Sequence, residues 1–207
     1  MKKIGKKTLK PRFVIGIDEV GRGPLAGPVA VGAVGVTRDM LRKFRTIKES
    51  KQLSAEKREV WTKEILRVAK EQKSELRTAV TMVSAKEIDT HGIVSAIKKA
   101  LTTSIKKLNI NPNDCEVLLD GGLKAPLEYK KQRTIIRGDA SKTAIAMASV
   151  IAKVKRDTYM TNLDKKYPNY GFAQHKGYGT KEHYRALKRK GISPLHRKSF
   201  LKSLHTA

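Results

Sequence analysis

Three short apolar segments of this chain each lead into acidic residues. Segment 13–17 runs into Asp18 and Glu19, segment 117–119 into Asp120, and segment 134–136 is followed, after two further residues, by Asp139. Segments of this length and composition are typical of buried strands. In open α/β sheets, functional groups gather outside the carboxyl ends of the strands. We therefore expect an α/β fold that brings these four acids to one edge of its sheet.

The rest of the chain supplies further strands and the helices. Segments 29–36 and 76–83 are also apolar, and a loop rich in glycine and proline joins the first of them to segment 13–17. Apolar stripes and N-caps predict the helices. These are a helix capped by Ser54 with Trp61, Ile65 and Val68 on one face, a stripe from Ile93 to Leu108, the apolar segment 144–154, and segment 180–188 capped by Thr180. We expect a mixed sheet of about five strands with helices on both faces.

The charge of the chain favours a polyanionic partner. Lys and Arg number 45 against 19 Asp and Glu, which gives a formal net charge of +26. Each Lys or Arg that neutralises a phosphate releases counterions, so nucleic acid explains the excess most simply. A generally basic proteome or a salt-adapted surface would give the same composition. Membrane-surface binding is the weaker alternative, because no amphipathic stretch combines a basic face with a broad aromatic face.

The length of 207 residues suits one domain. We expect this domain over residues 12–207, including a helical appendage at about 180–207, preceded by a basic, flexible arm at 1–11. A single cysteine, Cys115, excludes an internal disulfide and fits a reducing compartment. No signal-like apolar core follows the first lysines, and no apolar run approaches about 18 residues. We therefore expect a cytoplasmic protein that does not enter a membrane.

The acids suit divalent metal ions, because Mg²⁺ and Mn²⁺ prefer hard oxygen ligands. Four carboxylates suit two ions about 3.5 to 4 Å apart, one activating water and the other stabilising the leaving oxygen of a phosphodiester. Neighbouring residues of a regular strand point to opposite faces, so Asp18 and Glu19 share a site only if the chain leaves strand geometry between or just after them. Alone, this pair would be a solvated strand end, and Asp-Gly-Gly at 120–122 a turn. Their combination favours a metal site.

Three histidines lie in the basic C-terminal third of the chain. They are His175, His183 and His196. Their spacing is not that of a zinc site, so we expect structural or phosphate-contacting roles for them.

Several motifs follow one another along the chain. They are DEVGRGPLAGPV at 18–29, SKQLS at 50–54, LDG at 119–121, GDA at 138–140, ASVIAKVKRD at 148–157 and HKGYGT at 175–180. In this order they resemble the motifs of the ribonuclease HII family, the type 2 ribonucleases H. The resemblance covers about residues 13–200. The resemblance implies a ribonuclease H-like sheet with flanking helices and a helical C-terminal extension.

The resemblance also assigns roles to the acids. Asp18, Glu19 and Asp120 match the residues that bind a first metal ion in the family. Asp139 matches the acid that helps to hold a second ion. All four would therefore be catalytic as well as metal-binding, with Mn²⁺ or Mg²⁺ as the cofactor.

Other matched residues would bind the substrate. Gly21, Arg22 and Gly23 match the loop that reads the 2′-hydroxyl of a ribonucleotide and the adjoining phosphate, which fits because this hydroxyl distinguishes RNA from DNA. Tyr178 matches the tyrosine that packs on the neighbouring sugar, where another 2′-hydroxyl would be crowded. Lys51 lies in a matched motif, and phosphate contact and a plain surface cation are equally consistent with its position.

The function that this resemblance implies is that of a metal-dependent endonuclease. It would hydrolyse the RNA strand of RNA/DNA hybrids and cut 5′ to single ribonucleotides embedded in duplex DNA, leaving 3′-hydroxyl and 5′-phosphate ends. We expect a monomer. Two alternatives stay open. A non-catalytic basic nucleic-acid-binding protein would leave the acids unexplained, and a metal nuclease of the same fold acting on DNA structures would not need the Gly-Arg-Gly loop and Tyr178.

Overall fold

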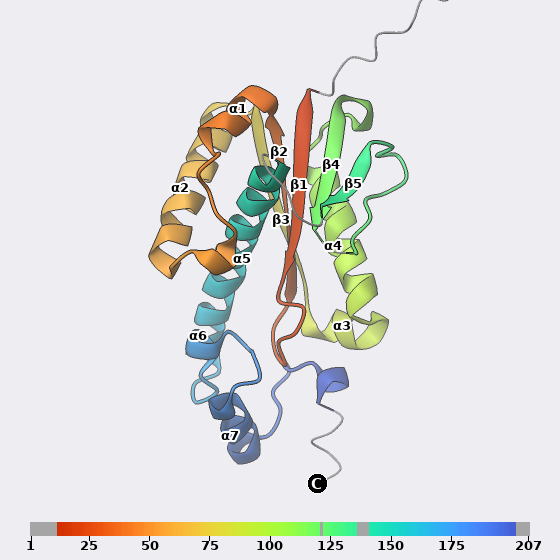
Figure 1. The fold of residues 1–207 in the computed structure, drawn as a ribbon. Coiled ribbons are helices and arrows are strands. Elements are labelled where there is room, and N and C mark those ends of the chain that lie inside the picture. The colour runs from red at the N-terminus through yellow and green to blue at the C-terminus, as the bar shows by residue number, and fades with distance from the viewer. Residues whose placement is uncertain (1–11, 121, 136–140, 202–207) are drawn as a thin grey trace, which may run out of the picture.

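A computed structural model describes residues 12–120, 122–135 and 141–201. They form a five-stranded mixed sheet with the order β3-β2-β1-β4-β5 (Figure 1). The strands are β1 (Phe13–Val20), β2 (Val29–Thr37), β3 (Leu76–Val83), β4 (Cys115–Asp120) and β5 (Gln132–Ile135). β2 pairs antiparallel with β1 and β3, whereas β1, β4 and β5 run parallel to one another. The predicted mixed α/β sheet is therefore confirmed.

Helices cover both faces of this sheet, as predicted (Figure 1). They are α1 (Arg38–Lys43), α2 (Ala55–Glu71), α3 (Ala85–His91), α4 (Ile93–Lys107), α5 (Ser141–Lys166), α6 (Phe172–His175) and α7 (Lys181–Lys190). α4 packs on one face with α3 beside it, and α5 packs on the other with α2 beside it. α6 and α7 lie beyond the sheet, past the carboxyl end of β1 (Figure 1).

The local signals for helix termini are present in the structure. The hydroxyl of Ser54 accepts a hydrogen bond from the backbone N–H of Lys57 and begins α2. Thr180 does the same for His183 and begins α7, which ends before Gly191. Such caps satisfy backbone N–H groups that have no partner within the helix. These two helices therefore begin at the residues that the sequence predicts.

The core has two layers, one on each side of the sheet. Along β1, Phe13, Ile15 and Ile17 pack on the α4 side, while Val14 packs on the α5 side. On the α5 side the helix comes very close to the strands. A Cβ added to Gly32 would lie 2.3 Å from the backbone oxygen of Ala148, so this glycine allows the close contact between α5 and β2. α5 is thus held tightly against β2 at Gly32, the residue that pairs with Asp18 of β1.

Several elements are longer than predicted. β1 continues past residue 17 to Val20, and α5 extends from Ser141 to Lys166 rather than over 144–154. β4 and β5 begin at Cys115 and Gln132, each two residues before the predicted segment, and residue 136 of the second segment lies outside the described residues. The three shortest α-helices, α1, α3 and α6, were not predicted. They have four to seven residues each, too short to show a helical period.

Some expectations concern residues that the structure does not describe. The arm at 1–11, Asp139 and the last part of the appendage, 202–207, lie outside the described residues. Over the ranges 12–120, 122–135 and 141–201, none of the helices combines the length and the apolar character that crossing a membrane requires.

Candidate active site

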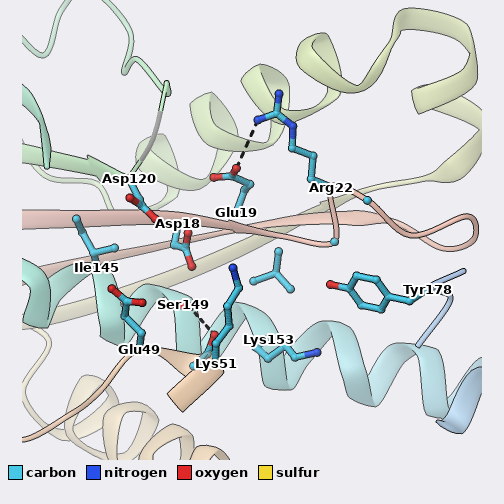
Figure 2. Close-up of a pocket in the computed structure, with 14 residues that line it drawn as sticks. Asp18, Glu19, Arg22, Glu49, Lys51, Asp120, Ile145, Ser149, Lys153 and Tyr178 are labelled. Atoms are coloured by element: carbon cyan, nitrogen blue, oxygen red, sulfur yellow. Dashed lines mark hydrogen bonds and ion pairs between the residues drawn. The ribbon is translucent and has the colours of Figure 1, made fainter. Parts of the chain in front are cut away.

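Three of the four predicted acids line one cavity. Asp18 and Glu19 lie near the end of β1, Asp120 is the last residue of β4, and the cavity between them has a volume of about 480 Å³ (Figure 2). The parallel pairing of β1 with β4 ends at Ile17 and Leu119. Beyond this point the two strands separate, so their next residues border open space. The fourth acid, Asp139, lies outside the described residues.

The way in which Asp18 and Glu19 share this cavity follows from the strand register. Both remain paired with β2, opposite Gly32 and Val31, so their side chains project to opposite faces of the sheet. The chain leaves strand geometry only at Gly21, whose φ is 87°. The two carboxylates reach the same cavity because β4 no longer covers that flank of β1. Asp18 and Glu19 therefore border one cavity because the pairing of β4 with β1 stops before them, a feature that the local sequence does not show.

Asp18 is the most strongly perturbed acid of the site. Its pKa is raised to about 7, chiefly by burial and also by the nearby negative charges of Glu19 and Asp120, while a hydrogen bond donated by Ser149 opposes the rise. Ser149 lies on α5 and shares a second hydrogen bond, of 2.7 Å, with the hydroxyl of Ser50. Both hydroxyls are buried. The position of Asp18 is thus determined by the contact between α5 and the sheet.

Glu19 lies beside the positive groups of the site. Burial raises its pKa, whereas the charges of Arg22 and Lys51 lower it. The guanidinium of Arg22 is 3.8 Å from the Glu19 carboxylate, and the Arg22 side chain is 59% exposed. An ion pair this long and this exposed contributes little to stability. Arg22 therefore keeps most of its hydrogen-bond donors free to meet a ligand.

The remaining predicted binding residues line the same cavity. Gly21 and Gly23 flank Arg22, and Lys51 extends from a short 3₁₀ helix at Ser50–Gln52 towards the acids (Figure 2). Tyr178 is 41% exposed and points its hydroxyl into the cavity from the opposite wall (Figure 2). Apart from Asp139, the structure brings together every residue that the sequence predicts for this site.

Other lining residues were not predicted as part of the site. They are Val20, Glu49, Ser50, Ile145, Ser149 and Lys153. The sequence carries one usable signal for them, because Ser149 is a polar residue within the apolar segment 144–154. Lys153 lies four residues before Asp157 on α5 and pairs with it at 2.9 Å. Its ammonium group also lies 5.9 Å from the ring centroid of Tyr178, which adds a positive charge to that wall.

The donor set fits a divalent cation. Asp18, Glu19 and Asp120 are oxygen ligands of the kind that Mg²⁺ and Mn²⁺ prefer. The raised pKa values of Asp18 and Glu19 show that the protein alone does not balance their negative charge. Within the described residues, however, no three His, Cys, Asp or Glu side chains lie close enough together to form a ready metal-binding group. The acids therefore share a cavity without forming a complete coordination shell.

Comparison with known proteins agrees with this geometry. A family model described as Ribonuclease HII matches residues 15–203. A Ribonuclease HII of Geobacillus kaustophilus is 43% identical over 189 residues, which cover 91% of this chain and 68% of that protein. In the solved complex of PCNA with RNase HII from Archaeoglobus fulgidus, the matched chain is 26% identical with a TM-score of 0.68, covering 89% of this chain and 93% of that one.

A third similarity concerns the fold alone. Bst-RNase HIII, solved in complex with Mn²⁺, is 20% identical to this chain with a TM-score of 0.59, and the match covers 96% of this chain and 68% of that one.

The family model spans far more than half of the chain, and its match includes every acid of the candidate site. The chain therefore belongs to the ribonuclease HII family.

Proposed function

We propose that this ribonuclease H is a metal-dependent endonuclease that hydrolyses the RNA strand of RNA/DNA hybrids and cuts 5′ to single ribonucleotides in duplex DNA. The products would carry 3′-hydroxyl and 5′-phosphate ends. The observation that carries the proposal is the composition of one cavity. Asp18, Glu19 and Asp120 line it together with Arg22, which lies beside Glu19, and with Tyr178, which lies at the end away from Asp120. Chemistry and recognition groups thus border the same space.

Asp18, Glu19 and Asp120 would hold the metal ions, with Asp139 as the fourth ligand. When bound, Mg²⁺ or Mn²⁺ supplies Lewis-acid stabilisation of the charge that develops on the phosphate oxygens. Two ions are the arrangement that four carboxylates favour. The protein compensates the negative charges of Asp18 and Glu19 only in part, as their raised pKa values indicate.

The recognition groups would orient the substrate. Arg22 offers a fork of donors that matches a phosphate, and the glycines on both sides let the backbone approach a sugar closely. A Cβ added to Gly23 would have no neighbour within 4 Å, so space for a ligand lies in front of this residue. Tyr178 would pack against the adjacent sugar. Lys51 and Lys153 would neutralise further phosphates along the cavity wall.

The same reasoning covers the wider setting of the protein. We propose one domain over residues 12–207 preceded by a basic arm at 1–11, since the family match spans 15–203. A monomer in the cytoplasm is the simplest state for a chain whose one cysteine, Cys115, is a buried free thiol. The basic charge would supply affinity for the duplex through phosphate contacts.

The test is cleavage of a DNA duplex that contains one ribonucleotide, with Mg²⁺ or Mn²⁺. We expect the wild-type protein to cut 5′ to the ribonucleotide and Asp120→Asn to lose about 10²-fold or more of this activity, because a carboxylate proposed to hold the metal ion is removed. Asp39→Asn is the matched control, since Asp39 is an exposed acid of α1 that does not line the cavity. Absence of the cut, or full activity of Asp120→Asn, would contradict the proposal.

A further inference from the structure

A buried cluster of arginine and histidine side chains packs against the loop that follows β1 and against the segment that carries Tyr178. It contains Arg156, His175, His183, His196 and Arg197, each at most 8% exposed. Among the described residues, neither arginine has an acidic partner in an ion pair. Buried charge without a counter-charge is costly unless hydrogen bonds satisfy it. The hydrogen bonds of this cluster therefore show what it holds in place.

Arg197 holds the backbone of the Gly-Arg-Gly loop. Its guanidinium donates to the carbonyl oxygens of Gly21 at 2.7 Å, Arg22 at 2.9 Å and Gly27 at 3.0 Å. Two of these three acceptors belong to the residues proposed to read the ribonucleotide. The rigid fork of an arginine can keep several carbonyl groups at set positions, which a lysine cannot do.

His196, the neighbour of Arg197, is linked to the opposite wall through His183. The backbone N–H of Ser193 donates to Nδ1 of His196 at 2.9 Å, so we assign the proton of His196 to Nε2. This Nε2 lies 3.0 Å from Nε2 of His183, which then accepts. The proton of His183 is left on Nδ1, which donates to the carbonyl oxygen of Tyr178 at 2.9 Å.

The backbone around these two residues ties the walls together. His196 pairs antiparallel with Ala26, in the loop between β1 and β2. The N–H of Arg197 donates to the carbonyl of Leu25 at 2.8 Å, and the N–H of Leu25 donates to Gly177 at 2.8 Å. Three segments distant in sequence thus meet at one point. In Figure 2, Arg22 and Tyr178 lie on opposite walls at the end of the cavity away from Asp120, and the Arg22 side chain points towards Glu19.

We infer that His196 and Arg197 are positioning residues. They hold the Gly21–Arg22 backbone on one wall of the cavity and Tyr178 on the other at the separation that binds one ribonucleotide. This inference rests on the proposed function and deepens it. Neither residue lines the cavity, so neither touches the substrate. Their effect passes through Arg22 on one side and through Tyr178 on the other.

A double-mutant cycle tests the first link. We expect Arg197→Lys to lower kcat/KM for the single-ribonucleotide duplex by about 10²-fold, the size of effect seen when recognition groups are misplaced by an ångström. If Arg197 acts through Arg22, the double variant Arg197→Lys/Arg22→Ala should lose roughly tenfold less kcat/KM than the product of the two single losses. A purely structural role would make the two losses multiply in full.

Arg77→Lys is the matched control for this cycle. Arg77 also donates to three backbone carbonyls, those of Lys73, Leu108 and Asn109, but it belongs to β3 and does not line the cavity. We expect its effect on activity to be small and to multiply fully with that of Arg22→Ala. Thermal unfolding of both lysine variants shows whether they lose comparable stability.

A second pair of variants tests the histidine link and decides the matter if Arg197→Lys does not fold. The amide nitrogen of His196→Gln can take the place of Nε2 and still donate to His183, whereas His196→Asn can mimic only Nδ1. We expect His196→Gln to keep most of the activity and His196→Asn to lose it, with a loss that does not multiply with that of Tyr178→Ala.

The outcomes separate this inference from the proposed function. If the wild-type protein does not cut at the ribonucleotide, the proposed function fails and the inference fails with it. If the wild type cuts but the losses multiply in full, or Gln and Asn at position 196 behave alike, the proposed function stands and the positioning role is wrong.

Discussion

Replacing Asp18 with asparagine should stabilise the metal-free protein at about pH 8 while removing its activity. Asparagine keeps the shape of the side chain and its acceptor for Ser149 but carries no charge. In the folded protein the pKa of Asp18 lies at about 7, against an ordinary value of 3.8. The charged form is therefore less stable in the folded chain than in the unfolded chain.

The magnitude follows from this difference in pKa. As the pH rises, the unfolded chain releases the Asp18 proton at a lower pH than the folded chain does. The loss of folding stability caused by this carboxyl group is therefore absent below about pH 4 and complete above about pH 7. A shift of about three pKa units sets an upper limit of about 4 kcal/mol. Because the buried amide has its own desolvation cost, we expect a gain of about 2 kcal/mol. For a chain of this size, that gain raises Tm by about 4 to 8 °C.

The assay is thermal unfolding in a chelator at about pH 8 and at about pH 4, with Asp39→Asn as the control. Asp18→Asn should be more stable than wild type at the higher pH and should lose this advantage at the lower pH, where only the desolvation cost of its amide remains. Added Mg²⁺ should raise the Tm of the wild type, because a ligand that binds the folded state stabilises it, and should raise that of Asp18→Asn much less. Equal stability of the two proteins at about pH 8 would refute the reasoning.

Two further perturbations test the packing around the site. Burial lowers the pKa of His183 to about 4, against an ordinary 6.5, so stability present above about pH 6.5 should be lost as the pH falls towards 4. Urea unfolding of wild type and His183→Gln between these pH values measures this loss. If the free energy of unfolding changed equally with pH in both proteins, the assignment would be contradicted. Gly32→Ala should destabilise the protein by about 1 to 3 kcal/mol, because the added Cβ would meet α5 at 2.3 Å. It should also reduce cleavage, since Ser149 moves with α5, and unchanged stability would show that the helix can shift freely.

The strands and long helices could be predicted because their signals are local. Each of these signals lies within a short stretch of sequence. Examples are the apolar run from Phe13 to Ile17, the caps at Ser54 and Thr180, and the apolar stripe that begins at Ile93. The end of β1 was less predictable. Asp18 and Glu19 are poor strand formers in isolation, and they remain in the strand because β2 continues to pair with them.

The site was predictable in its parts but not in its assembly. Motif resemblance identified Asp18, Glu19, Asp120, Arg22 and Tyr178, and all of them line one cavity. No local pattern indicates that β4 stops pairing after residue 119, although this is what lets both acids of β1 reach that cavity. The hydrogen bonds of the buried arginines are equally hidden, because their acceptors are backbone carbonyls that carry no sequence signature.

The contact between the loop after β1 and the C-terminal segment also has a consequence for folding. Arg197 reaches the carbonyl of Gly27 across 170 residues of chain, whereas β1 and β2 are joined by a short loop. Contacts of long sequence separation cost more loop-closure entropy and tend to form late. The acids at the end of β1 would then be in place before the wall that selects the substrate. In refolding, recovery of ribonucleotide recognition should lag behind recovery of the sheet.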